Sequence, residues 1–258
     1  MELGRPVFSG LFSGEIAVVT GGAQGIGHAV AAGLAAAGCH VVIADLDGDH
    51  AARAASEIAN AGHKCTARQV DVTSWEACQQ FAADVDRTVG AVAVLVNNAG
   101  TSTAARLGDD NFDSELQRIF GINVYGLLHV SRAFLAQLEH TRGVIVNVSS
   151  ITAFVAGNSA VPYAASKAAV TQATKNMARE LGAKGIRVNA IAPGLTKTPL
   201  AERALKDDAR IARTVERTCL KRIAEAQDMV GPVLFLASRM SPYVTGITLP
   251  VDGGYLAA

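Results

Sequence analysis

Short apolar runs alternate with longer amphipathic stretches along most of the 258-residue chain. The runs are rich in Val, Ile and Ala, and each is followed by a stretch of helix-forming residues. Because the runs are apolar almost throughout, they predict parallel strands buried on both faces of a sheet. The predicted strands are 16–20, 40–47, 64–73, 92–100, 143–150, 186–194 and 246–254.

The regular alternation of strand and helix predicts the fold class. Right-handed crossovers between parallel strands give an α/β fold, a doubly wound parallel sheet of about seven strands with helices on both faces, the Rossmann architecture. A long helical stretch is expected at about 109–140, and a short arm at residues 1–14. With no linker, repeat or low-complexity tract, we expect a single domain over residues 1–258. The polar and charged segment 195–225 interrupts the alternation and is expected to form short helices and a substrate lid.

A glycine-rich turn, Thr20-Gly21-Gly22-Ala23-Gln24-Gly25-Ile26-Gly27, joins the first strand to the first helix. Glycines at this position let the backbone approach a pyrophosphate, whose charge the helix N-terminus attracts. The spacing is G-x-x-x-G-x-G, which differs from the commoner G-x-G-x-x-G. A glycine-rich turn alone is a weak signal, but its place between a strand and a helix predicts a dinucleotide site.

Two acidic residues follow neighbouring strands at the same sheet edge. Asp45 lies about 18 residues beyond Gly27, where a ribose-binding carboxylate is expected. A helix-capping role suits Asp47 better. Asp71 is a candidate acceptor for the adenine amino group or an ordinary turn residue. Asn97 and Asn98, in the run NNAG at 97–100, are candidates for satisfying backbone groups at that edge.

Candidate catalytic residues lie in the stretch Asn147 to Lys167, which contains Ser149, Ser150 and Tyr163. Pro162 suits the first turn of a helix, Ser159 is a possible cap, and Gly182 and Gly185 mark the end. Tyr163 and Lys167 then lie one turn apart on one helix face. Free tyrosine has a pKa of about 10, and a neighbouring ammonium is expected to lower it towards neutral pH. Such pairs also occur on ordinary surface helices, so the pair by itself does not define a site.

The motifs together resemble the short-chain dehydrogenase/reductase family. TGGAQGIG, NNAG, Asn123, Ser150, Tyr163-x-x-x-Lys167 and Pro193-Gly194 occur in the family's order from about residue 14 to 256. The resemblance implies that Tyr163 is the catalytic acid/base and that Lys167 binds the nicotinamide ribose and lowers the Tyr163 pKa. Ser150, which matches better than Ser149, would orient the substrate. Asn123 would hold a water of a proton relay, or stabilise an irregular helical turn near Gly121.

The resemblance also implies a nicotinamide cofactor. Its expected contacts are Gly21, Gln24, Gly25, Ile26, Gly27, Asp45, Leu46, Asp71, Val72, Asn98, Ala99, Gly100, Tyr163, Lys167, Pro193, Gly194, Thr196 and Thr198. We expect NAD(H) rather than NADP(H), because Asp45 would repel a 2′-phosphate while Gln24 and Leu46 offer no positive charge. Arg53 is expected to face solvent, and His28 is mostly neutral at pH 7.

Composition excludes several other classes of partner. The formal net charge is zero, which argues against nucleic acid. No apolar run is long enough to span a membrane, and no secretory signal is visible at the N-terminus. Four scattered cysteines, Cys39, Cys65, Cys78 and Cys219, form no CxxC motif and are expected to be reduced thiols, with no metal site. We therefore expect a cytoplasmic protein.

The expected function is hydride transfer between NAD(H) and a secondary alcohol or ketone. The substrate pocket should draw on Ser102, Thr103, Thr152, Phe154, Leu195 and residues 199–220. We favour a small polar substrate such as a sugar or polyol, with a 3-oxoacyl or steroid-type reductase as the alternative. A non-catalytic NAD-binding sensor is the rival from another class. Family resemblance and the apolar surplus of two helices and the C-terminal region predict a homotetramer.

Overall fold

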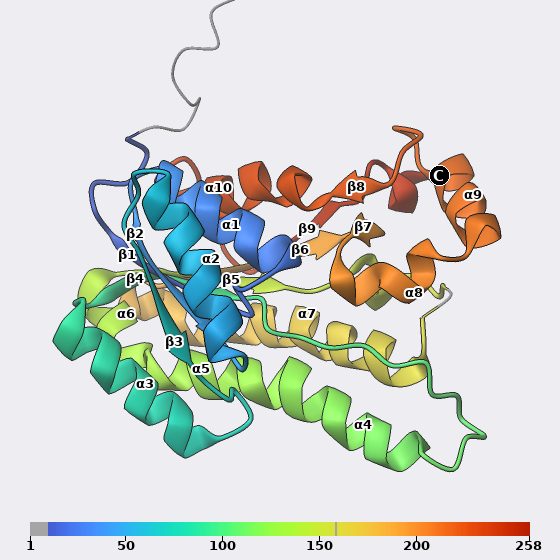
Figure 1. The fold of residues 1–258 in the computed structure, drawn as a ribbon, viewed down its shortest axis with the longest axis horizontal. Coiled ribbons are helices and arrows are strands. Elements are labelled where there is room, and N and C mark those ends of the chain that lie inside the picture. Colours follow the sequence, from blue (N-terminus) through green and yellow to red (C-terminus); the bar gives the residue numbers. More distant parts are fainter. Residues whose placement is uncertain (1–9, 158) are drawn as a thin grey trace, which may run out of the picture.

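The computed structural model describes residues 10–157 and 159–258. Its main sheet is seven-stranded and parallel, in the order β3-β2-β1-β4-β5-β6-β9 (Figure 1). The predicted seven-stranded doubly wound fold is therefore confirmed. The strands are β1 (Ile16–Thr20), β2 (His40–Asp45), β3 (Cys65–Gln69), β4 (Val92–Asn97), β5 (Val144–Val148), β6 (Arg187–Pro193) and β9 (Thr248–Val251). Residues 1–9 of the expected arm lie outside the described residues.

Helices cover both faces of the sheet (Figure 1). One face packs against α1 (Gly25–Ala36), α2 (Gly48–Asn60) and α10 (Val230–Ala237). The other packs against α3 (Trp75–Thr88), α5 (Leu127–Ala133), α6 (Leu135–Thr141) and α7 (Val161–Leu181). Successive side chains of a strand point to opposite faces, so Ala17 and Val19 of β1 join the first core and Val18 joins the second.

Several predicted strands were too long at their carboxyl ends. β2 ends at Asp45 rather than 47, β3 at Gln69 rather than 73, β4 at Asn97 rather than 100, and β9 at Val251 rather than 254. At the ends of β2 and β4 the chain leaves the sheet where the carboxyl ends of parallel strands open into a ligand crevice at a topological switch point. β2 and β4 flank β1 and place that switch point beside its end.

The single helix predicted for about 109–140 is broken in the structure. It consists of α4 (Phe112–Phe120), the π-helical turn η1 (Gly121–Gly126), α5 and α6. A Cβ on Gly126 would lie 2.6 Å from Val72 Cγ2, so the π turn brings the backbone against the chain after β3. No single helix among the described residues meets the length and apolarity of a membrane span, although the bent pair Phe112–Ala133 and Leu135–Thr141 passes that test together.

The helix that carries Tyr163 and Lys167 begins differently from the prediction. Its N-cap is Ala160, which makes no side-chain cap, and Pro162 lies in the first turn. Ser159 is one residue too early to cap the helix and instead lines a cavity. The predicted end is confirmed, because α7 stops at Leu181 and Gly185 adopts a left-handed φ of 80°.

The segment after β6 forms the short helices that its sequence predicted. It contains η4 (Pro199–Ala201), α8 (Glu202–Leu205) and α9 (Asp208–Arg217). A two-stranded parallel pair, β7 (Thr196–Lys197) with β8 (Ala224–Glu225), joins the two ends of the segment. The chain then continues through η5 (Ala226–Met229) into α10. The excursion is thus anchored at its base, outside the main sheet (Figure 1).

Candidate active site

A cavity of about 1650 Å³ opens at the carboxyl ends of the strands. It is larger than the roughly 300–1,000 Å³ of an ordinary small-molecule pocket. Its walls come from the glycine-rich turn, the ends of β2 and β4, the start of α7 and helices α8 and α9. The volume therefore accommodates a dinucleotide together with a second, smaller molecule.

The glycine-rich turn has no room for side chains. A Cβ on Gly27 would lie 2.1 Å from the carbonyl oxygen of Gly21, and one on Gly21 would lie 2.8 Å from Ala99 Cα. Gly21 and Gly25 also adopt left-handed φ angles of 61° and 56°, which favour glycine. Gly27 itself lies behind the cavity wall. These close approaches put bare backbone at the cavity surface.

The N-terminus of α1 is left available for an anion. Gln24 occupies the N-cap position without a side-chain hydrogen bond, and the first turn contains no acidic residue. The first N–H groups of a helix need partners, and the helix dipole favours negative charge there. Gln24, Gly25 and Ile26 all line the cavity. Turn and helix together fit the pyrophosphate of a dinucleotide.

Asn98 fixes the turn from the neighbouring strand. Its Nδ2 donates to the carbonyl oxygens of Thr20 and Gly21, at 3.0 and 2.8 Å. The Thr20 hydroxyl accepts hydrogen bonds from the N–H groups of Asn98 and Ala99. The predicted backbone-satisfying role of Asn98 is confirmed. The same prediction for Asn97 is wrong, because Asn97 Nδ2 donates to the side chains of Ser131 and Asn147 in the core.

Asp45 lies at the end of β2 and faces the cavity. Its carboxylate accepts the N–H groups of Ala23 and Asp47, at 3.1 and 3.2 Å. Asp47 caps α2 by accepting the N–H of His50, as predicted. Asp71 also lines the cavity, and its Oδ1 accepts hydrogen bonds from the N–H and hydroxyl of Thr73. Two carboxylates thus stand at this end of the cavity.

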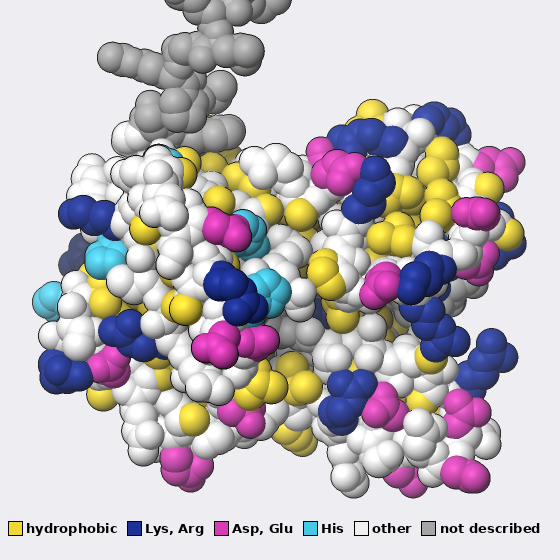
Figure 2. All heavy atoms as spheres, viewed as in Figure 1, with side chains coloured by type: hydrophobic (Ala, Val, Ile, Leu, Met, Phe, Trp, Pro, Cys, Tyr) yellow, Lys and Arg dark blue, Asp and Glu magenta, His cyan; other side chains and the backbone are white. Residues whose placement is uncertain are grey.

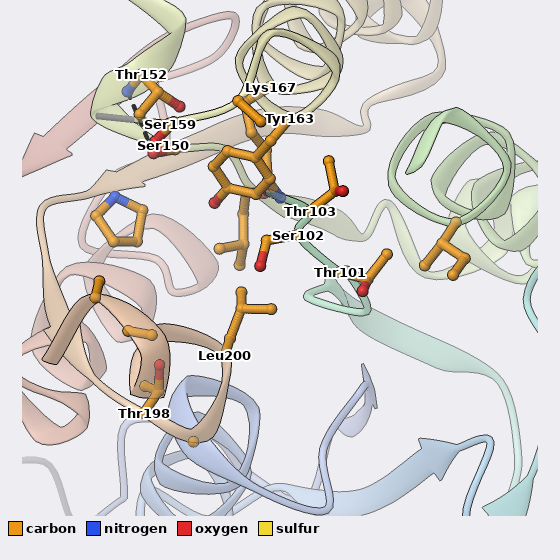
Figure 3. A pocket seen from close by; sticks show the side chains of 18 of the residues that line it. Thr101, Ser102, Thr103, Ser150, Thr152, Ser159, Tyr163, Lys167, Thr198 and Leu200 are labelled. Carbon is orange, nitrogen blue, oxygen red and sulfur yellow. Dashed lines mark hydrogen bonds between the residues drawn. The ribbon is translucent and has the colours of Figure 1, made fainter. Parts of the chain in front are cut away.

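Ser150, Tyr163 and Lys167 meet at the other end of the cavity (Figure 3). Lys167 is 5% exposed; its Nζ donates to the carbonyl oxygen of Val148 at 2.8 Å and lies 5.8 Å from the centre of the Tyr163 ring. The Ser149 hydroxyl is bonded to Lys167 O and Thr171 within the protein. Ser150 is therefore the serine whose hydroxyl stays near Tyr163.

Burial dominates the acid–base behaviour of this cluster. It raises the pKa of Tyr163, while the hydrogen bond with Ser150 opposes that rise. It also lowers the pKa of Lys167 to about 8, because the ammonium is removed from water. The expected lowering of the Tyr163 pKa by Lys167 is therefore not what the structure shows. The ammonium directs a hydrogen bond to Val148, and burial of the phenol outweighs its influence.

Asn123 lies in the π turn and is 1% exposed. Its side chain accepts from Thr101 N and donates to Thr101 O and Ser166 Oγ. It lies behind the cavity wall, close to Gly100: a Cβ there would be 3.3 Å from Asn123 Oδ1 and 3.5 Å from Lys167 Nζ. Asn123 therefore lies in the irregular turn predicted near Gly121, and its side chain ties that turn to Thr101 and to α7.

The segment after β6 completes the wall beside Tyr163. A Cβ on Gly194 would lie 3.0 Å from Asp252 Cα, and the methyl group of Thr198 contacts the Gly25 position. The Thr196 hydroxyl donates to the carbonyl oxygen of Gly194 at 3.0 Å. Of the predicted site residues, the cavity is lined by Gly21, Gln24, Gly25, Ile26, Asp45, Leu46, Asp71, Val72, Asn98, Ala99, Gly100, Ser150, Tyr163, Lys167, Pro193, Gly194, Thr196 and Thr198.

The predicted substrate pocket needs one correction. Ser102, Thr103, Thr152, Leu195 and part of 199–220 line the cavity, but Phe154 points away and is 47% exposed. It directly follows the short helix η2 (Ile151–Ala153). No cluster of potential metal ligands occurs among the residues that the structure describes.

Sequence reasoning missed a group of arginines at this end. Arg118 of α4 donates to Thr101 Oγ1 and Ser102 O, and forms a bidentate pair with Glu115. That pair, with the Thr103 hydroxyl, lowers the pKa of Glu115 to about 2. Arg210 and Arg213 of α9 also line the cavity. The spacing of Arg210 and Arg213 on one predicted helix face was the available signal.

Fold, turn and side-chain cluster define a dinucleotide-dependent oxidoreductase. The family model adh_short_C2, described as enoyl-(acyl carrier protein) reductase, matches residues 21–256. The chain belongs to the short-chain dehydrogenase/reductase family.

Known proteins resemble the chain over nearly its whole length. Oxidoreductase UcpA of Salmonella typhimurium is 37% identical over 255 residues, covering 95% of each chain. The 5-keto-D-gluconate 5-reductase of Escherichia coli is 33% identical over 251 residues, covering 96% of this chain and 98% of that one. A gluconate 5-dehydrogenase from Burkholderia cenocepacia, solved with NADP and tartrate, superposes with a TM-score of 0.92 at 33% identity, covering 96% and 97% of the two chains.

Proposed function

We propose that this protein transfers a hydride between NAD(H) and a small polar secondary alcohol or ketone, of the sugar or polyol class. The observation that carries the proposal is that Ser150, Tyr163 and Lys167 line one cavity with an uncapped helix N-terminus and its glycine-rich turn. A non-catalytic NAD sensor has no need of a buried lysine and a partly buried phenol in the same cavity as the dinucleotide turn.

The side chains divide the work in the following way. In oxidation the Ser150 hydroxyl holds the substrate oxygen and the Tyr163 phenolate accepts its proton; reduction reverses both steps. Lys167 binds the nicotinamide ribose, and Asn123 holds the backbone around Thr101 in place. When bound, the dinucleotide supplies the hydride chemistry at its nicotinamide ring and, in its oxidised form, a positive charge. A positive charge there would favour the Tyr163 phenolate, whereas burial raises the pKa of Tyr163 and its hydrogen bond with Ser150 lowers it.

The choice of NAD over NADP rests on Asp45. Its carboxylate is held by two backbone N–H groups at the cavity edge, where it accepts bonds from ribose hydroxyls and repels a 2′-phosphate. The neighbouring Gln24 and Leu46 are neutral, Arg53 is exposed on α2 outside the lining, and His28 lies 3.6 Å from Glu57. The B. cenocepacia neighbour was solved with NADP, so the proposed preference rests on the side chains of this protein and not on that neighbour.

The polar substrate class has two supports. Ser102, Thr103, Thr152 and Ser159 give the substrate end several hydroxyl groups, and one relative is a ketogluconate reductase. The apolar side chains there, Val155, Leu195 and Leu200, leave an acyl or steroid substrate as the second candidate, and the family model is itself described by an acyl substrate.

We further propose a single domain with a lid at 195–225, acting in the cytoplasm without a metal.

A panel of alcohols tests the proposal. Sugar acids, polyols, a 3-hydroxyacyl thioester and a hydroxysteroid are each incubated with NAD or NADP, and reduction is followed at the nicotinamide absorbance. We expect turnover of polyhydroxylated substrates with NAD, and its loss in Tyr163→Phe. Tight NAD binding without turnover of any substrate would favour the sensor, while turnover of the thioester or steroid alone would favour the second candidate.

A further inference from the structure

The cations of the segment after β6 fall into two sets. Those that face away from the large cavity all have partners within the chain. Lys206 pairs with Glu202 at 2.6 Å, and Arg222 pairs with Asp228 at 2.6 Å. The others are Lys197, paired with Glu225, Arg217, which lies over the ring of Tyr255, and Lys221, which donates to the carbonyl oxygen of Glu216.

The second set lines the cavity: Arg203 on α8, and Arg210 and Arg213 on α9. Within residues 10–157 and 159–258, no carboxylate lies within 4.0 Å of these guanidinium groups, and none of them donates a hydrogen bond. Figure 2 shows Lys and Arg side chains near α8 on this face of the molecule, with Asp and Glu side chains among them. The unpartnered cations of the segment are therefore those that face the ligand space.

The acids of the cavity do not neutralise these arginines. Of the acids on the same segment, Asp207 is the one that lines the cavity, and its carboxylate caps α9 by accepting the N–H of Arg210 at 2.9 Å. Asp45 and Asp71 lie beyond β2 and β3, where each accepts local hydrogen bonds. The substrate end of the cavity therefore carries a surplus of fixed positive charge at every physiological pH, because guanidinium groups stay protonated.

We propose that Arg210 and Arg213, with Arg203, bind a carboxylate on the substrate, so that the enzyme acts on hydroxy acids rather than neutral polyols. Three residues apart on α9, Arg210 and Arg213 lie on one helix face. The planar guanidinium offers paired donors that match a carboxylate. Arg210 is half-buried, which limits the competition of water for its donors. The proposal rests on the proposed function and narrows its substrate class.

The phosphates of the cofactor are the other anions that reach this cavity. The pyrophosphate already has a site at the uncapped N-terminus of α1 and the bare glycines before it. The arginines belong to α8 and α9, on the separate excursion after β6. A substrate whose carboxylate is bound there can direct its hydroxyl-bearing carbon towards Ser150 and Tyr163. Helices α8 and α9 would then select substrates by their charge.

The test compares matched substrates of different charge. We measure kcat/KM with NAD for D-gluconate and for D-glucitol, which differ by a carboxylate against a hydroxymethyl group, in wild type, Arg210→Gln and Arg213→Gln. Each substitution should lower the ratio of gluconate to glucitol activity about tenfold, the size expected when a charge-assisted hydrogen bond is lost. Lys206→Gln is the control: it removes one charge from the same segment but from outside the cavity, and its ratio should equal that of wild type.

Binding measurements separate this proposal from the proposed function. D-gluconate and tartrate are titrated by calorimetry into wild type and Arg210→Gln in the presence of NAD, whether or not turnover occurs. Binding that weakens about tenfold in Arg210→Gln supports the carboxylate site even if neither compound is oxidised. Equal losses for gluconate and glucitol, no binding of either acid to wild type, or a loss confined to NAD affinity would each overturn it. The last outcome would assign the arginines to the cofactor phosphates.

Discussion

Lys167 Nζ lies 5.8 Å from the centre of the Tyr163 ring and donates a hydrogen bond to the carbonyl oxygen of Val148. Both groups are held by α7, and both are shifted away from their charged forms by burial. The two side chains are therefore in position for catalysis, but burial favours their neutral forms. Their charged forms would become more favourable when a cofactor and substrate bind in the cavity.

Tyr163→Phe should lower kcat by at least about 10²-fold, the range for loss of a general acid–base group. Cofactor affinity should stay near wild type, because the phenol faces the reacting oxygen and not the pyrophosphate-binding turn. Steady-state kinetics and NAD titration by intrinsic fluorescence measure the two effects. Full activity in this variant would contradict the assignment.

Lys167→Met should lose both turnover and NAD affinity while folding normally. The pKa of Lys167 is lowered to about 8 by burial, so its ammonium is present below that pH and is lost as the pH rises through it. In wild type the Kd for NAD should therefore rise between about pH 7 and 9, and the variant should lack this step. Because protonation of the buried amine is disfavoured in the folded state, lysine destabilises the fold most below pH 8. Denaturant unfolding at pH 7 should therefore show a variant at least as stable as wild type.

Asp45→Ser should reduce the preference for NAD over NADP. The ratio of kcat/KM for the two cofactors should fall on the order of tenfold to a hundredfold. The substitution removes the acceptor for the ribose hydroxyls and the charge that repels a 2′-phosphate. The measurement is kcat/KM for both cofactors in wild type and variant. A wild-type enzyme that prefers NADP, or an unchanged ratio, would mean that Asp45 does not read the ribose.

Residues 199–220 should become more protected from hydrogen exchange when NAD and substrate are both bound. α9 has no buried residue, and the segment is anchored to the rest of the chain by the short β7–β8 pair. Exchange mass spectrometry with and without ligands tests this, with peptides from β4 and β5 as internal references. Equal protection in both states would argue against a lid.

The protein should assemble as a homotetramer with twofold axes. Tyr125 in the π turn and Leu128 in α5 are 58% and 38% exposed, and Ile247, before β9, is 39% exposed. Burying such apolar positions stabilises an assembly. Light scattering at micromolar concentration measures the mass, and a monomer would refute the prediction.

The sequence by itself determined the main sheet and the placement of the cofactor and catalytic residues. The apolar runs determined the parallel sheet, because only buried strands tolerate Val and Ile on both faces. Glycine spacing, Asp45 and the Tyr163–Lys167 interval determined the cofactor end and the catalytic cluster, because each depends on local geometry within a turn, a strand end or a helix. Each of these features depends on residues close together in the sequence, so it can be predicted without knowing the rest of the fold.

Only the tertiary structure decided how those groups behave. The π turn within 109–140 lies where Gly126 approaches Val72, from another part of the chain, and burial raises the pKa of Tyr163. The division of the cations after β6 into paired and cavity-facing sets likewise follows from where α8 and α9 lie relative to the cavity. Solvation and pairing are set by neighbours that the chain brings together only on folding, so no local pattern of residues contains them.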